Sequence, residues 1–534
     1  MDTIFSAKKA LILDKRHDDL RTLRELLLRL GVGQVMVASS VNMALSILRE
    51  ESVDLCFMVY DLGKGEKSGL QLMYEAQAEG LYRYGTSYIL VADTDAAALM
   101  FGSLESSPDL CIDKPYNEAQ VRLSLERLLR LKLALSPLDV CMDKAHWVEA
   151  LSLCEQKLEQ FPALRIFLQR LQGIILLKLG RYVQARTLFD RLLSERDQHW
   201  MRVGVGVAAY HQGDLVQAED SLAWVIRQQQ VCVDAFNWLA RLHRLKGDLQ
   251  QSVILLRKSV LLQPSVAFLQ SAQGHAAAQV KDWRLAVDSF RAAVRFGRYS
   301  AFQSPENYFA LAQALKARMD NLQGPPAEEA EREAIQVLEQ VVEDFDHDPV
   351  AQFRSRLLLA DLLRQCGDRV RAEQAGRAAL GLFEELPLER RAQWLDQLTD
   401  GLEQSESASH ALAVRHALTP KMAGIDWASA NIRGMKQFRK AALTPARDNF
   451  IAAYQAQPGN PSVGLNLVQT ELELLRQSSA GQPVEGIRRC DDILHGLQYA
   501  ALTQRQQQRY QTLAERLALQ VRTRLMPPLP DQNN

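Results

Sequence analysis

The stretch HQGDLVQAEDSL, residues 211–222, decides the fold of most of this chain because its pattern recurs along the middle of the sequence. The glycine of this stretch is Gly213, and the same position recurs at intervals of 33 or 34 residues at Gly180, Gly247 and Lys281. A small residue and then a large apolar residue follow each of them, as Ala218 and Leu222 do here. This period is typical of a helix–turn–helix repeat, which cannot bury its apolar face alone. The repeats must therefore stack into an all-α solenoid, whose curved wall is a binding surface.

The first 130 residues lack this period and alternate short apolar runs with amphipathic stretches. The apolar runs predict strands at 10–13, 35–38, 55–59, 87–91 and 110–112. The amphipathic stretches predict helices at 17–30, 41–50, 69–78, 94–104 and 116–131. Five strands that are each followed by a helix indicate an α/β fold with a doubly wound, five-stranded parallel sheet.

Chemistry in such a sheet gathers at the carboxyl ends of the strands. Asp14, Asp61 and Lys114 follow the first, third and fifth predicted strands. Two carboxylates and a lysine suit a phosphoryl-acceptor site, with Asp61 as nucleophile, Asp14 helping to hold Mg²⁺, and Lys114 neutralising phosphoryl charge. Each residue alone is as well explained by a turn or a cap, so the prediction rests on their joint placement.

Residues 7–130 resemble the receiver domains of two-component response regulators. The resemblance rests on LILD ending at Asp14, on DLGKGEKSGL at 61–70, and on DKPY at 113–116. It implies that Asp61 is the phosphoacceptor, with Lys114 as its lysine. It also implies a Mg²⁺ site formed by Asp14, Asp61 and the backbone carbonyl of Gly63.

Three positions depart from the receiver pattern. Lys15 stands where the family has a second acid, Ala92 where it has Thr or Ser, and Cys111 where it has a switch aromatic. Because Mg²⁺ is held by one or two carboxylates, losing one should weaken the site. We expect Lys15 to pair with Asp61 and stand in for the metal. The domain is then either phosphorylated with altered switching or a pseudo-receiver that acts through partner binding alone.

Asp18 and Asp19 could replace the missing metal ligand. The simpler interpretation is that they open a helix, where the helix dipole stabilises acidic side chains.

The helical part from about 138 to 300 resembles tetratricopeptide repeats, with Gly206 as a small packing residue. The predicted domains are a receiver at 1–132, well-matched repeats at 137–346, and degenerate repeats at 347–534. An irregular stretch is expected near 386–426, where the period is lost.

The first helix of each repeat is expected to line the concave wall. Its exposed positions, read from the register, are Arg170, Tyr210, Asn237, Arg241, Arg244, His275 and Lys316. Cationic and hydrogen-bonding groups in a groove suit an acidic peptide segment or a carboxylate terminus. A merely solvated helix face explains the same residues equally well.

Composition limits the function classes. With 63 Lys+Arg against 64 Asp+Glu, the 534 residues carry a net charge of −1, which argues against nucleic acid as a partner. The only candidate recognition helix, at 505–524, contains Glu515 and fits a solenoid cap better. The seven cysteines lack the paired spacing of zinc or disulfide sites. No apolar stretch predicts a membrane span or a signal peptide, so a cytoplasmic protein is expected.

The sequence thus predicts a response-regulator-type protein of a phosphorelay, and not an enzyme that turns over a substrate. A histidine kinase or phosphotransfer protein would phosphorylate Asp61, and the receiver would control a solenoid that binds a protein partner, with a homodimer allowed. The alternative is a constitutive scaffold whose degenerate receiver serves for docking or dimerisation.

Overall fold

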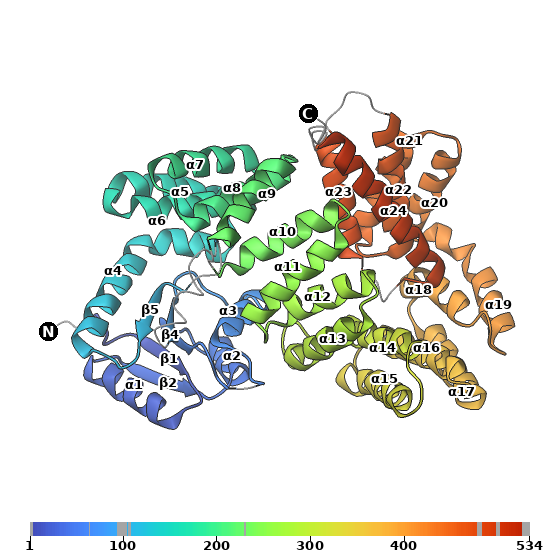
Figure 1. Ribbon diagram of the computed structural model, residues 1–534, viewed down its shortest axis with the longest axis horizontal. Helices are drawn as coiled ribbons and strands as arrows, with labels where there is room; N and C mark the ends of the chain where they lie inside the picture. Colours follow the sequence, from blue (N-terminus) through green and yellow to red (C-terminus); the bar gives the residue numbers. More distant parts are fainter. Residues whose placement is uncertain are drawn as a thin grey trace, which may run out of the picture. The chain divides into compact units, whose positions relative to one another are not determined.

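The computed structural model describes residues 4–63, 65–92, 104, 108–228, 231–477, 483–497 and 502–525 (Figure 1). The chain divides into two compact units. The first comprises Met1–Leu242, Gln251–Gln270 and Arg295–Gln303. The second comprises His243–Gln250, Ser271–Val294 and Ser304–Asn534.

The N-terminal sheet confirms the predicted doubly wound fold. Its strands are β1 (Lys9–Leu13), β2 (Gln34–Ala38), β3 (Leu55–Val59), β4 (Ser87–Ala92) and β5 (Leu110–Asp113). They lie in the order β2-β1-β3-β4-β5, and every neighbouring pair is parallel. Leu13 pairs with Met58, and Val59 pairs with Val91, so the chain leaves β1 and β3 at the same edge. This edge carries the predicted site.

Four described helices accompany the sheet: α1 (His17–Arg29), α2 (Val41–Glu50), α3 (Gly69–Ala78) and α4 (Glu118–Asp143). The Ser40 and Ser68 hydroxyls cap α2 and α3 by accepting hydrogen bonds from the backbone N–H groups of Met43 and Gln71. The helix predicted at 94–104 lies outside the described residues except for Leu104. Helix α4 continues without a break through 132–137, where the first domain was expected to end.

The rest of the described chain is helical, as predicted. The helices are α5 (Trp147–Gln160), α6 (Arg165–Lys178), α7 (Tyr182–Glu195), α8 (His199–Gln212), α9 (Leu215–Arg227), α10 (Val233–Leu245), α11 (Leu249–Leu262), α12 (Ala267–Gln279), α13 (Trp283–Gly297), α14 (Pro305–Met319), α15 (Pro325–Asp344), α16 (Pro349–Gln365), α17 (Arg369–Glu385), α18 (Leu388–Gly401), α19 (Ala408–Leu418), α20 (Asp426–Arg439), α21 (Leu443–Ala456), α22 (Pro461–Gln477), α23 (Pro483–Gly496) and α24 (Gln504–Arg524). Helices α18 and α19 occupy most of the stretch predicted to be irregular. None of the helices in the described part of the chain has both the length and the apolar character that a membrane span requires.

The recurring turn position joins the two helices of each repeat in a left-handed backbone conformation. The φ angles are 69° at Gly180, 79° at Gly213, 82° at Gly247 and 61° at Lys281. Glycine adopts such angles without a steric penalty, which explains why it recurs at this position. Lys281 adopts the same conformation, so the turn is kept even where the glycine is not.

Within a hairpin, a glycine of the first helix packs against a large side chain 16 residues later in the second. The pairs are Gly173 with Phe189, Gly206 with Leu222, Gly274 with Phe290, and Gly434 with Phe450. A Cβ atom at any of these glycines would lie 2.4 to 2.7 Å from the facing side chain. The predicted packing role of Gly206 is confirmed, because the missing side chain lets the two helices approach closely.

A methyl group at Gly274 should therefore destabilise the second unit. Its Cβ would lie 2.7 Å from two ring carbons of Phe290, and overpacking of this kind costs about 1–3 kcal/mol. We expect Gly274→Ala to lower the melting temperature followed by circular dichroism.

Gly381 in α17 provides the matched control, because a Cβ there would meet nothing within 4 Å. We expect Gly381→Ala to hold or raise the melting temperature, since alanine favours a helix by about 0.5–1 kcal/mol over glycine. Equal melting temperatures for Gly274→Ala and the wild type would show that the glycine–ring contact does not limit the packing.

Candidate functional site

A cavity of about 290 Å³ opens where β1, β3, β4 and β5 end. Its walls include the carboxylates of Asp14 and Asp61 and the cations of Lys15, Arg16 and Lys114. The cavity therefore brings together the three residues that the sequence predicted at one site: Asp14, Asp61 and Lys114. Arg16 is a further cation of this cavity that the sequence reasoning missed.

Asp61 is the second residue of the loop between β3 and α3 and is exposed at the cavity. One of its carboxylate oxygens accepts a hydrogen bond from the backbone N–H of Gly63 at 2.8 Å. Gly63 also lines the cavity, with a φ angle of 111°. The loop thus turns back on the carboxylate, and Asp61 stays exposed.

Lys114 joins two carboxylates. Its Nζ lies 3.2 Å from Oδ2 of Asp14 and 2.6 Å from Oδ2 of Asp19. Asp14 is only 4% exposed and also accepts a hydrogen bond from the backbone N–H of Arg16 at 2.9 Å. The Asp19 carboxylate lies in the first turn of α1 and also pairs with Arg16 at 2.8 Å. Asp19 is therefore more than a helix-opening residue, because it helps to hold the site lysine.

The prediction that Lys15 forms an ion pair with Asp61 is wrong. Nζ of Lys15 lies 2.8 Å from Oε1 of Glu66, farther along the β3–α3 loop. Both side chains are about half exposed, so water screens the pair. Lys15 pairs with Glu66 because the loop places that carboxylate beside its ammonium group. The Asp61 carboxylate instead accepts a hydrogen bond from the Gly63 N–H.

The residues present do not fit a well-formed Mg²⁺ site. Mg²⁺ needs near-octahedral oxygen ligands. The cavity offers two carboxylates against three cationic side chains, and Asp14 is already engaged by Lys114 and the Arg16 backbone. Within the segments that the structure describes, no group of three or more His, Cys, Asp or Glu side chains is arranged to hold a metal ion.

In the first unit, four of the residues predicted to line the concave wall make internal contacts. The Arg170 guanidinium donates to the Leu104 carbonyl at 3.1 and 3.2 Å, and burial lowers the pKa of Arg170. Tyr210 is only 5% exposed, and its hydroxyl accepts a hydrogen bond from Nε of Arg241 at 3.1 Å. The Asn237 side chain accepts from the Ser259 hydroxyl at 2.7 Å. The expectation of an exposed face is wrong for Tyr210, because neighbouring helices cover it.

In the second unit, Arg244 pairs with the buried Asp491 at 2.8 Å and Lys316 pairs with Asp361. His275 packs edge-on against Phe290, and burial lowers the pKa of His275 to about 4, so it is neutral near pH 7. His275 and Lys316 do line a cavity, of about 670 Å³. Its charged lining is balanced, with the cations Lys316, Arg354, Arg364 and Arg505 and the acids Asp320, Asp361, Asp400 and Glu403. The balance does not single out an acidic partner.

Comparison with known proteins supports the repeat architecture. Residues 170–223 and 206–265 match the family model described as "Tetratricopeptide repeat". No curated protein sequence matches the chain. The strand order confirms the doubly wound α/β domain, and this match confirms that tetratricopeptide-like repeats follow it.

Among solved structures, a CheY-like receiver domain from Methylobacillus flagellatus is 26% identical, with a TM-score of 0.20; the similarity covers 24% of this chain and 99% of that domain. The C-terminal part of a tetratricopeptide protein from Cytophaga hutchinsonii is 15% identical, with a TM-score of 0.37 and coverage of 47% and 96%. A tetratricopeptide protein from Parabacteroides merdae is 13% identical, with a TM-score of 0.29 and coverage of 64% and 98%.

Removing the Lys114 cation should destabilise the protein, because it leaves the buried Asp14 carboxylate without its charge partner. Loss of one member of a buried pair costs about 3–5 kcal/mol. Since Lys114 keeps 13% of its side chain exposed, we expect a value near the lower end of that range for Lys114→Met. Urea unfolding followed by circular dichroism measures it.

Two further variants test the cause. Lys15→Met removes a cation from the same cavity but from an exposed pair, so its effect should stay within about 1 kcal/mol. The double variant Asp14→Asn/Lys114→Met should recover most of the loss, since no buried charge is left unpaired. A double variant no more stable than Lys114→Met would contradict the assignment of the loss to Asp14.

Proposed function

We propose that this protein is a signalling adaptor of a phosphorelay, in which Asp61 accepts a phosphoryl group and the tetratricopeptide repeats bind a protein partner. The observation that carries the proposal is the exposed Asp61 carboxylate in a cavity shared with Lys114, Lys15 and Arg16. A carboxylate among cations suits transfer of a dianionic group, because positioning and charge neutralisation supply most of the catalysis in phosphoryl transfer.

The proposed step needs only the side chains of this cavity and a donor. A carboxylate oxygen of Asp61 forms the new O–P bond. The bond from phosphorus to the donor's leaving group breaks, and the electron pair goes to the leaving group. Lys114 faces the charge that Asp61 gains, while Asp14 and Asp19 hold the ammonium in place. The natural donor would be a histidine kinase or a phosphotransfer protein, in line with the receiver resemblance.

The partner half of the proposal rests on the repeats. Stacked tetratricopeptide hairpins present concave surfaces that take up peptide segments. The 670 Å³ cavity of the second unit is our candidate for such a surface; it is lined by α12, α13, α14, α16, α18 and the start of α24. Its walls combine Leu357 and Leu358 with both signs of charge, which suits a segment of mixed character.

A constitutive scaffold is the second candidate function that this geometry supports. The observation that favours it is the Asp14 carboxylate, which is occupied by Lys114 and Arg16 in place of a metal. A domain of this kind would dock partners without accepting phosphate.

Phosphoryl uptake separates the two candidates. We expect the protein, incubated with acetyl phosphate with or without Mg²⁺, to gain the mass of one phosphoryl group by intact-mass spectrometry, with acetate as the leaving group. Asp61→Asn should gain none, because the amide is not a nucleophile of this kind.

Asp113→Asn is the matched control, since Asp113 is an exposed aspartate at the end of β5, in the same sheet, but does not line the cavity. It should be labelled like the wild type. Equal labelling of wild type and Asp61→Asn, or labelling of neither, would favour the scaffold.

A further inference from the structure

The residue before Asp61 is bound to the helical repeats of the same compact unit. The Tyr60 hydroxyl donates a hydrogen bond to the backbone carbonyl of Leu262, the last residue of α11, at 3.1 Å. Burial and the nearby Asp61 charge raise the pKa of Tyr60, so the hydroxyl stays protonated and can donate. One end of the loop that carries Asp61 is therefore attached to the repeats.

The other end of this loop is attached as well. The Ser68 N–H donates to the Ser265 hydroxyl at 3.1 Å, and Nη2 of Arg295 donates to the Gly65 carbonyl at 3.0 Å. A Cβ atom at Gly65 would lie 2.2 Å from Nη2 of Arg295, so a side chain here would displace the guanidinium, and the φ angle of 83° also favours glycine. The loop is thus held at Tyr60 before the proposed acceptor and at Gly65 and Ser68 after it.

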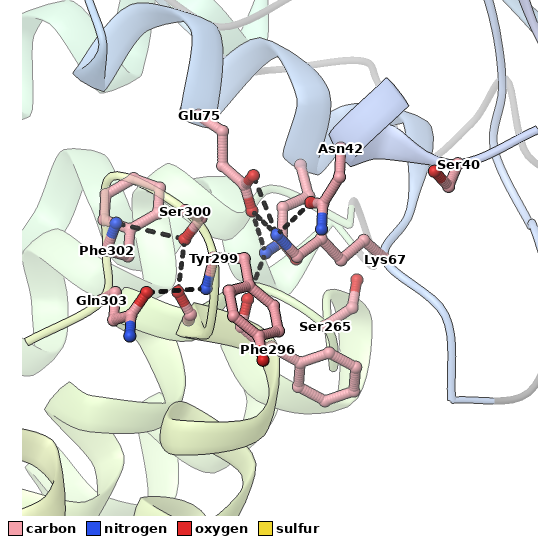
Figure 2. A network of polar contacts seen from close by, with 12 residues as sticks. Ser40, Asn42, Lys67, Glu75, Ser265, Phe296, Tyr299, Ser300, Phe302 and Gln303 are labelled. Carbon is pink, nitrogen blue, oxygen red and sulfur yellow. Dashed lines mark hydrogen bonds and ion pairs between the residues drawn. The ribbon is translucent and has the colours of Figure 1, made fainter. Parts of the chain in front are cut away.

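A buried charge network supports the first turns of α3 at this contact (Figure 2). Lys67 donates to Asn42 at 3.0 Å and to Glu75 at 2.9 Å, and Glu75 is fully buried. Burial raises the pKa of Glu75, and the Lys67 charge opposes that shift. Gln71 donates to Glu75 at 2.6 Å and to the Phe296 carbonyl of α13 at 3.3 Å. The network therefore links the loop to the end of α13 through polar groups that tolerate little displacement.

Apolar contacts complete the surface. The Tyr74 ring packs edge-on against Phe268, with 5.4 Å between ring centres, and its hydroxyl lies 3.4 Å from the Gln263 side chain. Tyr74 and Leu262 also pack against the buried cluster of Val233, Val266 and Leu269. We call this surface the docking face; it consists of Tyr60, Gly65, Ser68, Gln71 and Tyr74 against Leu262, Ser265, Phe268, Arg295 and Phe296.

We propose that the docking face couples the charge state of Asp61 to the helical repeats, and that phosphorylation of Asp61 loosens it. The inference rests on the proposed function. A phosphoryl group on Asp61 replaces the single carboxylate charge by about 1.5 to 2 negative charges and brings three acceptor oxygens to the cavity that Lys15 lines. Lys15 now holds Glu66, which lies between the Gly65 and Ser68 attachments. Competition for Lys15 releases Glu66 and so shifts the segment that contacts Arg295 and Ser265.

Amide hydrogen exchange rates of the unphosphorylated protein test whether the docking face is formed. The Ser68 N–H has Ser265 as its hydrogen-bond acceptor, so Ser265→Ala should speed exchange in residues 60–68 by roughly three- to ten-fold, as expected for one lost hydrogen bond. Tyr60→Phe should act in the same direction. Ser194→Ala, the same substitution at the exposed end of α7, is the control and should leave this segment unchanged. Unchanged exchange in both Ser265→Ala and Tyr60→Phe overturns the docking face.

The coupling between the charge of Asp61 and the docking face is tested in the phosphorylated protein. After acetyl phosphate treatment, exchange in residues 60–68, 262–268 and 295–303 should rise several-fold in the wild type and not in Asp61→Asn. Intact mass of the same sample tells the two failures apart. Phosphorylated protein with unchanged exchange overturns the coupling and leaves the proposed function standing. Protein that takes up no phosphoryl group overturns both.

Discussion

The close approach of α3 to the end of β3 is the constraint on which the site depends. A Cβ atom at residue 69 would lie 2.2 Å from the Val59 carbonyl oxygen, so a glycine must open α3. The Gly69 N–H also lies 3.4 Å from the Tyr60 carbonyl. The described residues 60–63 and 65–68 thereby belong to a short closed loop that holds Asp61, the Gly63 N–H and the atoms that contact α11 and α13. In a short loop with fixed ends, a displacement of one residue also displaces its neighbours. A change at Asp61 is therefore expected to alter the contacts of the docking face.

The sequence predicted what depends on local pattern and on topology. The strands at 35–38 and 55–59 and the turn at Gly213 follow from periodicity and turn chemistry, and Asp14, Asp61 and Lys114 meet because parallel strands end at one edge. The pairing of Lys15 with Glu66 could not be predicted, since several acids lie within reach of one lysine and the loop conformation decides among them. The same limit applies to Asp19, whose place in α1 fits both a helix start and a partner of Lys114. Tyr210 was misjudged because repeat register fixes the face of a helix but not what covers that face.

The charges of the cavity explain why the site both resembles and departs from a metal-assisted acceptor. Lys114 lies between Asp14 and Asp19, Lys15 stands where a further acid would be needed for Mg²⁺, and Arg16 adds another cation to the cavity. Positive side chains are present before any phosphoryl group arrives. Such an arrangement stabilises an incoming anion electrostatically and makes the exposed Lys15–Glu66 pair the contact that is most easily exchanged.

The most direct test of this account alters the loop closure itself. Gly69→Ala must push α3 away from Val59, and the account predicts faster hydrogen exchange in residues 262–268 of the unphosphorylated protein, while α8 exchanges at the wild-type rate. Exchange in 262–268 that equals the wild type, with α3 itself exchanging faster, would contradict the claim that the Asp61 loop and the helical repeats move as one coupled element.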